Sequence, residues 1–193
     1  MSPQTSPRPI RRGSEHSSFT VGVVGVTGTI GSRVARLLAD AGHDVVGVSR
    51  NPAASALYRA VAADLRNEAA AQAALAGIDV VYLTTPEGGA DPLGDEQVIV
   101  RNVIAAAARA GVKHLVMHTA LRANRGNTGA RILDNKTSLE AALRDSGVPF
   151  SILRPAWYLQ NLFGAQYYLN ADGNNNISPG ASRGARLALI ARF

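Results

Sequence analysis

Residues 21–31 read Val21-Gly22-Val23-Val24-Gly25-Val26-Thr27-Gly28-Thr29-Ile30-Gly31, and the rest of the architecture follows from this run. The valines predict a short buried strand that ends at a turn with glycines at three-residue intervals. In such a turn Gly25 allows a sharp bend, Gly28 lets the backbone approach a pyrophosphate, and Gly31 lets the next helix lie close to the sheet. The first N–H groups of that helix then face the phosphates. The predicted cofactor-binding residues here are Gly25, Thr27, Gly28, Thr29, Ile30 and Gly31.

The alternative is a tight strand–helix turn that binds nothing, and the pattern of the remaining chain argues against it. Strands are predicted at 44–50, 61–64, 78–86, 112–119 and 149–154. Helices are predicted at 51–60, 66–76, 95–110 and 131–146, after a first helix whose apolar stripe is Ile30, Val34, Leu37, Leu38 and Ala41. Six strands alternating with helices predict an α/β fold, a doubly wound parallel sheet of the Rossmann type with helices on both faces and strand order 3-2-1-4-5-6.

Length and composition set the broad class. A chain of 193 residues suits one domain with a small appendage, and a hydrophobic share of 46% supplies a substantial core. The absence of cysteine excludes disulfides, thiol catalysis and thiolate metal sites, and the four histidines show no metal-binding spacing. No apolar run approaches the length of a membrane span, so we expect a cytoplasmic protein with no membrane partner.

The net charge of +6 raises the question of a nucleic-acid partner. Residues 1–18 are rich in Ser, Pro, Arg and Gly, are typical of a disordered tail, and hold three of the arginines against a single glutamate. The other basic residues are spread through helices and loops with few aromatic residues between them, and no DNA-reading motif is present. We therefore predict no nucleic-acid partner, and a basic surface that attracts a phosphate-bearing cofactor.

The end of the second strand predicts the choice of cofactor. An NAD-selective site places Asp or Glu there, about 20 residues after the glycines, to bind the ribose 2′-OH. This chain has Ser49 and Arg50 instead, so nothing repels a 2′-phosphate and the arginine is able to pair with one. The pattern favours NADP and leaves NAD as the alternative. The other interpretation of Arg50 is an ordinary solvated arginine.

Two further strand ends contribute candidates for the same site. Asp64 and Leu65 follow the third strand, where an adenine ring would lie at the mouth of the sheet. Asp64 is equally suited to cap the next helix. Thr84, Thr85 and Pro86 end the fourth strand and are predicted to face the ribose and pyrophosphate of the cofactor.

These segments together resemble the NmrA-like branch of the atypical short-chain dehydrogenase/reductase superfamily. The motifs that carry the resemblance are 23–31, 48–52, 63–65, 111–116, Asn135-Lys136 with Glu140, and the Arg-Pro…Asn segment at 153–162. The resemblance implies an NAD(P)-binding Rossmann domain that usually prefers NADP, here over residues 19–165. It also implies that the glycine turn holds the pyrophosphate and that Arg50 holds the 2′-phosphate.

The resemblance implies two residues near the site of hydride transfer. Lys136 matches a lysine that assists near the nicotinamide ribose or in proton transfer, and Thr119 falls where many short-chain dehydrogenases place a serine. Ile132 stands where the wider superfamily has the tyrosine of Tyr-x-x-x-Lys, so that phenolic acid is missing. Lys136 is therefore a catalytic cation, a cofactor-ribose ligand, or a lysine on an exposed helix face.

The C-terminal residues depart from the family and leave three hypotheses. Residues 166–193 are turn-rich and close on one apolar run, so we interpret them as the remnant of a shortened substrate-binding portion. The leading hypothesis is an NADPH-dependent oxidoreductase that acts on a small quinone-like or carbonyl acceptor. The alternative, favoured by the missing tyrosine, is a non-catalytic NADP(H)-sensing regulator that binds a protein partner. The third is an inactive fragment.

Overall fold

A computed structural model of the chain describes residues 18–85, 90–126 and 128–156, and the structural statements below refer to these residues. They form one sheet of six parallel strands in the order β3-β2-β1-β4-β5-β6, as predicted. The strands are β1 (Thr20–Val24), β2 (Asp44–Ser49), β3 (Arg59–Ala62), β4 (Val80–Leu83), β5 (His114–His118) and β6 (Phe150–Leu153). The helices are α1 (Thr29–Asp40), α2 (Glu68–Ala74), α3 (Pro92–Ala110) and α4 (Arg131–Arg144).

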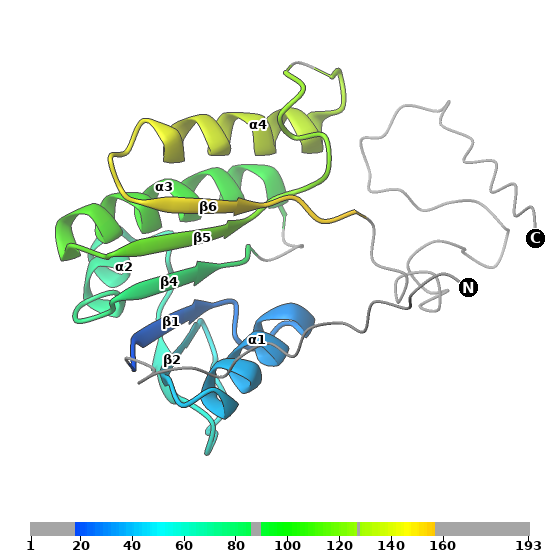
Figure 1. The fold of residues 1–193 in the computed structure, drawn as a ribbon. Coiled ribbons are helices and arrows are strands. Elements are labelled where there is room, and N and C mark those ends of the chain that lie inside the picture. The colour runs from blue at the N-terminus through cyan, green and yellow to red at the C-terminus, as the bar shows by residue number, and fades with distance from the viewer. Residues whose placement is uncertain (1–17, 86–89, 127, 157–193) are drawn as a thin grey trace, which may run out of the picture. The chain divides into compact units, whose positions relative to one another are not determined.

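Helices cover both faces of this sheet, which confirms the doubly wound Rossmann arrangement. Val45 and Val46 are neighbours on β2 but belong to different core clusters, because successive strand residues point to opposite faces. The Val45 cluster contains Ala35 of α1, and the Val46 cluster contains residues of α2, α3 and α4. In Figure 1, α1 lies beside β1 and β2, whereas α3 and α4 lie along β5 and β6. The predicted inward position of Leu37 is wrong, since this side chain is 68% exposed.

The strand register brings the predicted site to one edge of the sheet. Val24, the last residue of β1, pairs with Val48 of β2 and with Leu83 of β4. The segments that follow β1, β2 and β4 therefore leave the sheet together at its carboxyl edge. This is the edge at which open α/β sheets bind their ligands.

The predicted helix at 51–60 is wrong. The chain between β2 and β3 runs through bends, and β3 begins at Arg59. The Ser55 hydroxyl accepts a hydrogen bond of 3.0 Å from the N–H of Leu57, a local contact that competes with helix formation. Tyr58 then packs against the α1-side core.

Tyr58 occupies the space above Gly47, and this close packing gives a testable prediction. Gly47→Ala is expected to lower the free energy of unfolding by about 1–3 kcal/mol. Its added Cβ would lie 2.5 Å from Tyr58 Cδ2 and 3.0 Å from Val26 Cγ1. Urea unfolding of Gly47→Ala, Tyr58→Ala and the double variant measures the energetic coupling between the two positions. The free energy of unfolding should fall less in the double variant than the sum of the two single losses. Additive losses would show that the ring does not fill this space.

Candidate functional site

The glycine turn has one open position between two closed ones. Gly25 adopts φ +78°, and a Cβ there would lie 2.5 Å from Thr84 Oγ1. A Cβ on Gly31 would lie 2.1 Å from the carbonyl oxygen of Gly25, so only glycine allows α1 to approach the turn so closely. A Cβ on Gly28 would meet one described atom within 4 Å, the Gly25 oxygen at 3.3 Å. Gly25 and Gly31 shape the turn, and Gly28 leaves its outer side open.

The N-terminus of α1 offers unused hydrogen-bond donors at this open position. Gly28 is the N-cap, no described side chain caps the helix, and its first turn carries no acidic residue. The side chains of Asn67 and Asp91 cap α2 and α3, whereas α4 also lacks a side-chain cap but carries Asp134 in its first turn. Thr27 and Thr29 beside the cap are exposed. An uncapped helix end with free N–H groups and a positive dipole end suits a phosphate.

The end of β2 adds a buried hydroxyl without a partner and an exposed cation. Ser49 Oγ is buried and forms no hydrogen bond with the described residues. A buried hydroxyl left unsatisfied is destabilising, so such an atom often marks a missing ligand or water. Arg50 is exposed, in agreement with its predicted role and equally with a solvated arginine. These residues and the open turn fit the phosphate and ribose groups of a dinucleotide.

Asp64 is held by Arg66, two residues further along the chain. Arg66 Nη2 lies 2.6 Å from Asp64 Oδ2, and Arg66 Nε lies 3.0 Å from Asp64 Oδ1. Hydrogen bonds from the Arg66 side chain and backbone lower the pKa of Asp64 to about 2, with a smaller contribution from the charge of Arg50. Asp64 does not cap α2, because Asn67 does. Leu65 is buried in the core, with 6% of its surface exposed.

The residues that follow β4 mostly bind the protein itself. The Thr84 hydroxyl donates a 2.8 Å hydrogen bond to the carbonyl oxygen of Val24, which ties the end of β4 to the end of β1. The Thr85 hydroxyl donates to the carboxylate of Glu96 on α3. Pro86 lies outside the described residues. A cofactor role for these three residues remains a prediction.

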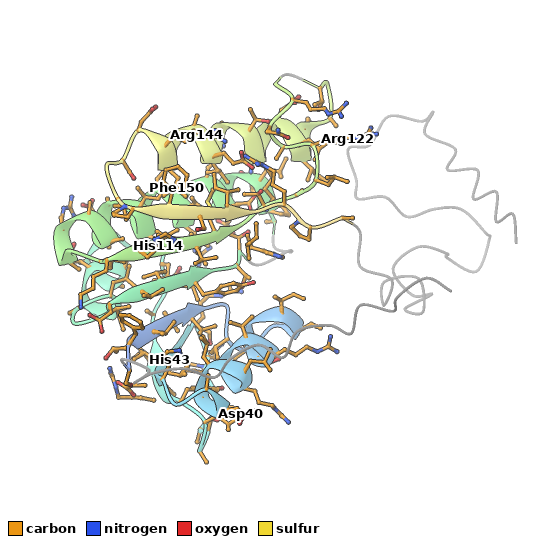
Figure 2. The ribbon with its side chains drawn as sticks, in the orientation of Figure 1. Asp40, His43, His114, Arg122, Arg144 and Phe150 are labelled. Atoms are coloured by element: carbon orange, nitrogen blue, oxygen red, sulfur yellow. The ribbon has the colours of Figure 1, made fainter. Side chains whose placement is uncertain are left out.

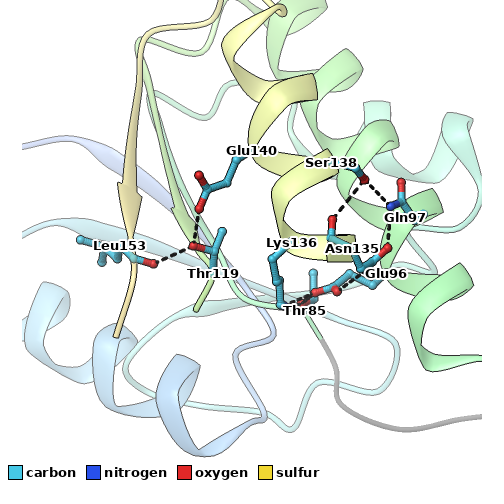
Figure 3. A network of polar contacts seen from close by, with 9 residues as sticks. All are labelled: Thr85, Glu96, Gln97, Thr119, Asn135, Lys136, Ser138, Glu140 and Leu153. Atoms are coloured by element: carbon cyan, nitrogen blue, oxygen red, sulfur yellow. Dashed lines mark hydrogen bonds and ion pairs between the residues drawn. The ribbon is translucent and has the colours of Figure 1, made fainter. Parts of the chain in front are cut away.

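Lys136 is an interior lysine, so its interpretation as a lysine on an exposed helix face is wrong. Its side chain is 17% exposed and forms an ion pair with Glu96, whose side chain is 6% exposed. Lys136 Nζ also lies 3.5 Å from Thr85 Oγ1. Figure 3 shows Lys136 and Asn135 of α4 meeting Glu96 of α3 beside Thr85. This places the ammonium group near the carboxyl edge of the sheet.

Sequence reasoning missed Glu96, although a signal was available. The buried apolar residues of α3 include Ile99, Val100 and Val103, which lie three, four and seven residues after Glu96. This spacing places all four residues on one face of the helix. Glu96 continues that face by one turn toward the N-terminus and is 5% exposed. A carboxylate on a buried face requires a charged or hydrogen-bonding partner, and here it has three.

Thr119 lies at the end of β5, but its hydroxyl is engaged in the interior. The residue is 7% exposed, and its hydroxyl donates a 2.9 Å hydrogen bond to Glu140 of α4. Its backbone N–H donates to the carbonyl oxygen of Leu153 at 2.8 Å. Glu140 also binds Arg154 and Arg144. The contacts of Thr119 join β5, β6 and α4, and its catalytic role remains a prediction.

The described residues contain no group of three His, Asp or Glu side chains that could hold a metal ion. His43 lies just before β2 and His114 begins β5, and Figure 2 shows them at separate places in the fold. Among the same residues, every helix is too short or too polar to cross a membrane.

The sheet, the glycine turn and the open end of α1 define a dinucleotide-binding α/β protein. The model of a protein family described as NAD(P)H-binding matches residues 25–186, well over half of the chain. The chain therefore belongs to this NAD(P)H-binding family.

Individual relatives are also similar to much of this chain. NAD(P)H azoreductase of Xenophilus azovorans is 35% identical over 149 residues, which are 72% of this chain and 49% of the relative. Quinone oxidoreductase 2 of Escherichia coli (strain K12) is 29% identical over 186 residues, 89% of this chain and 63% of the relative. The crystal structure of the NADPH-dependent quinone oxidoreductase of Escherichia coli with NADPH has a TM-score of 0.63 at 30% identity, over 77% of this chain and 53% of that one. The chain thus spans between about half and 63% of these relatives.

Proposed function

We propose that this protein is an NADPH-dependent oxidoreductase of the NmrA-like type that acts on a small quinone-like or carbonyl acceptor. The observation that carries the proposal is the open helix end at Gly28, beside the unpartnered Ser49 hydroxyl and the exposed Arg50. These groups suit a pyrophosphate, a ribose and a 2′-phosphate in turn. The names of the azoreductase and the quinone oxidoreductase support a reductase acting on a flat organic acceptor.

In this proposal the cofactor, when bound, supplies the hydride, and the protein binds and orients it. The N–H groups at the start of α1 bind the pyrophosphate, and Ser49 Oγ binds a ribose oxygen. Arg50 pairs with the 2′-phosphate, because a guanidinium fork matches phosphate oxygens. Lys136 provides a fixed positive charge near the nicotinamide end. We propose residues 19–165 as the NAD(P)-binding domain.

The regulator remains a second candidate because Ile132, where the superfamily tyrosine would stand, supplies no acid. Its partner would be another protein instead of a small-molecule acceptor. Turnover separates the two functions, since a regulator binds NADPH without oxidising it. We also propose that the protein is located in the cytoplasm, and cell fractionation tests this location.

The test is a calorimetric titration of the full chain with NADPH and then with NADH, followed by an acceptor screen. We expect NADPH to bind more tightly than NADH, and NADPH absorbance at 340 nm (a general property of the reduced cofactor) to fall when a benzoquinone or an azo dye is added. Binding without oxidation in the presence of any acceptor would favour the regulator. No heat of binding with either cofactor would contradict both functions.

Arg50 provides a prediction about cofactor choice. Arg50→Glu is expected to weaken NADPH binding by at least about tenfold, because a charge-assisted hydrogen bond contributes roughly 1.5–3 kcal/mol and the new carboxylate repels the 2′-phosphate. NADH binding should be retained, because a carboxylate at this position accepts a hydrogen bond from the 2′-OH. Arg33→Glu on the exposed side of α1 is the matched charge control. An unchanged ratio of the two dissociation constants would mean that Arg50 does not bind the 2′-phosphate.

A further inference from the structure

We propose that Glu96 is the positioning residue of the site: it holds the ammonium group of Lys136 at the carboxyl edge of the sheet before any ligand arrives. This inference rests on the proposed function, because it assigns Lys136 a ligand-facing role. It concerns a buried carboxylate on α3 that neither the glycine turn nor the cofactor-selecting residues require.

The three partners of Glu96 come from two separate segments, the end of β4 and helix α4. Oε1 accepts hydrogen bonds from Lys136 Nζ and from the Thr85 hydroxyl, and Oε2 accepts one of 2.7 Å from Asn135 Nδ2. Thr85 follows β4, whereas Asn135 and Lys136 lie on α4. One buried carboxylate therefore fixes the lysine relative to a strand end that borders the predicted cofactor site (Figure 3).

A second layer of hydrogen bonds holds Asn135, one of the partners of Glu96. Gln97 Nε2 donates to Asn135 Oδ1 at 2.5 Å and to Ser138 Oγ at 2.6 Å. Asn135 is thereby oriented with its amide nitrogen toward Glu96. Support of this kind fixes the rotamers of the groups that bind a ligand.

The ammonium group keeps donor capacity after these contacts are made. Lys136 Nζ has three hydrogens, and within the described residues its acceptors are Glu96 and Thr85. A third hydrogen is available for a ligand oxygen. A free lysine loses up to about 2 kcal/mol of rotamer entropy on binding, and a lysine already held in place avoids much of that loss.

A purely structural ion pair is the competing explanation, and the chain contains one for comparison. Lys113 Nζ lies 2.8 Å from Asp79 Oδ1, just before β5 and β4 and so at the amino edge of the sheet. Its lysine is 66% exposed, whereas Lys136 is 17% exposed. Asp79 and Lys113 join two strand starts far from the predicted site, so this pair is the matched control.

The first measurement does not depend on the cofactor. The acetylation rate of each lysine in the full chain, measured with acetic anhydride and mass spectrometry, depends on how exposed its amine is and on how readily the ammonium group loses its proton, and an ion pair lowers both. Glu96→Gln is expected to accelerate acetylation of Lys136 at least about fivefold and to leave Lys113 unchanged, because the amide loses the ion pair but keeps the volume. An unchanged Lys136 rate overturns the positioning role, whether or not NADPH binds.

The second measurement is a double-variant cycle on NADPH affinity by calorimetry, with KM and kcat compared where turnover occurs. Glu96→Gln and Lys136→Met should each raise the dissociation constant about tenfold, and the double variant should be no weaker than Lys136→Met alone. Lys113→Met should leave the dissociation constant unchanged. Independent, additive losses, or full affinity in Lys136→Met, overturn the inference.

The two measurements distinguish failure of the inference from failure of the proposed function. If the unaltered chain binds neither cofactor, the proposed function fails, and the acetylation rates alone decide the positioning role. If Glu96→Gln does not fold, Glu96→Asp replaces it, because it keeps the charge with a side chain one methylene shorter. The Glu96→Asp variant should then acetylate at Lys136 faster than the unaltered chain, since the shorter carboxylate holds the ammonium group less closely. An unchanged rate in that variant overturns the inference.

Discussion

Replacing Gly31 with alanine is expected to lower the free energy of unfolding by about 3 kcal/mol, at the upper end of the overpacking range. The new Cβ would lie 2.1 Å from the Gly25 carbonyl oxygen and 2.7 Å from the Gly25 carbonyl carbon. Both atoms belong to the backbone, so no side chain can rotate away to relieve the contact. Helix α1 must then move off the turn, and its packing on the sheet is lost with it. Urea unfolding monitored by circular dichroism measures the change.

Gly28 is the matched position for this prediction. It lies three residues before Gly31, and its added Cβ would approach one described atom, the Gly25 oxygen, at 3.3 Å. Gly28→Val is therefore expected to remove NADPH binding while lowering the unfolding free energy by only about 1 kcal/mol, the cost of placing valine at a helix N-cap. The isopropyl group would occupy the open side of the turn, where a pyrophosphate must reach the helix N–H groups. Equal stability losses in both variants, or normal NADPH affinity in Gly28→Val, would contradict this division of roles.

The sheet could be predicted from the sequence because its signals are local. The glycine spacing at 25, 28 and 31 and the alternation of apolar runs with helical segments each occupy one short stretch. Parallel strands joined by right-handed crossovers then permit few strand orders. The wrong helix at 51–60 shows the limit of this reasoning. Asn51 followed by Pro52 is a local signal for the start of a helix, but the packing of Tyr58 over Gly47 is a tertiary contact that overrides it.

Sequence reasoning proposed site residues that come from the end of a single strand. It missed the contacts that form where two helices pack together. Ser49 and Arg50 follow directly from the end of β2. The partner of Lys136 is 40 positions earlier in the chain, and only the packing of α3 beside α4 brings Glu96 to it. In the same way, Thr119 suggested a hydroxyl near the reaction, whereas folding places Glu140 within 2.9 Å of it. Such pairs cannot be inferred from spacing, because nothing in the sequence fixes the rotation of one helix against the other.

Glu140 gives the second large effect, through a carboxylate that is fully buried. Arg154 binds it with two hydrogen bonds, Nε to Oε1 at 2.8 Å and Nη2 to Oε2 at 2.6 Å. Arg144, one turn along α4, binds Oε2 at 2.8 Å from a side chain that is 44% exposed. Arg154→Ala is expected to lower the free energy of unfolding by about 3 kcal/mol, because it leaves a buried charge without its principal partner. Arg144→Ala, the control on the same carboxylate, should lose less than about 1 kcal/mol.

The same cluster predicts the direction of acid sensitivity. Burial alone raises the pKa of Glu140, but hydrogen bonds from Arg154, Thr119 and Arg144 together outweigh it and hold the pKa below the ordinary value of 4.5. Because the pKa of Glu140 is lower in the folded state than in the unfolded state, its ionised form stabilises the fold, and this contribution is complete above about pH 4.5. The contribution is lost as the pH falls through the folded-state pKa. Glu140→Gln should therefore flatten the decline in melting temperature on acidification below that pH. If the variant and the unaltered chain decline in parallel, the Glu140 carboxylate does not titrate with unfolding, and the acid sensitivity must come from exposed pairs such as Asp64 with Arg66.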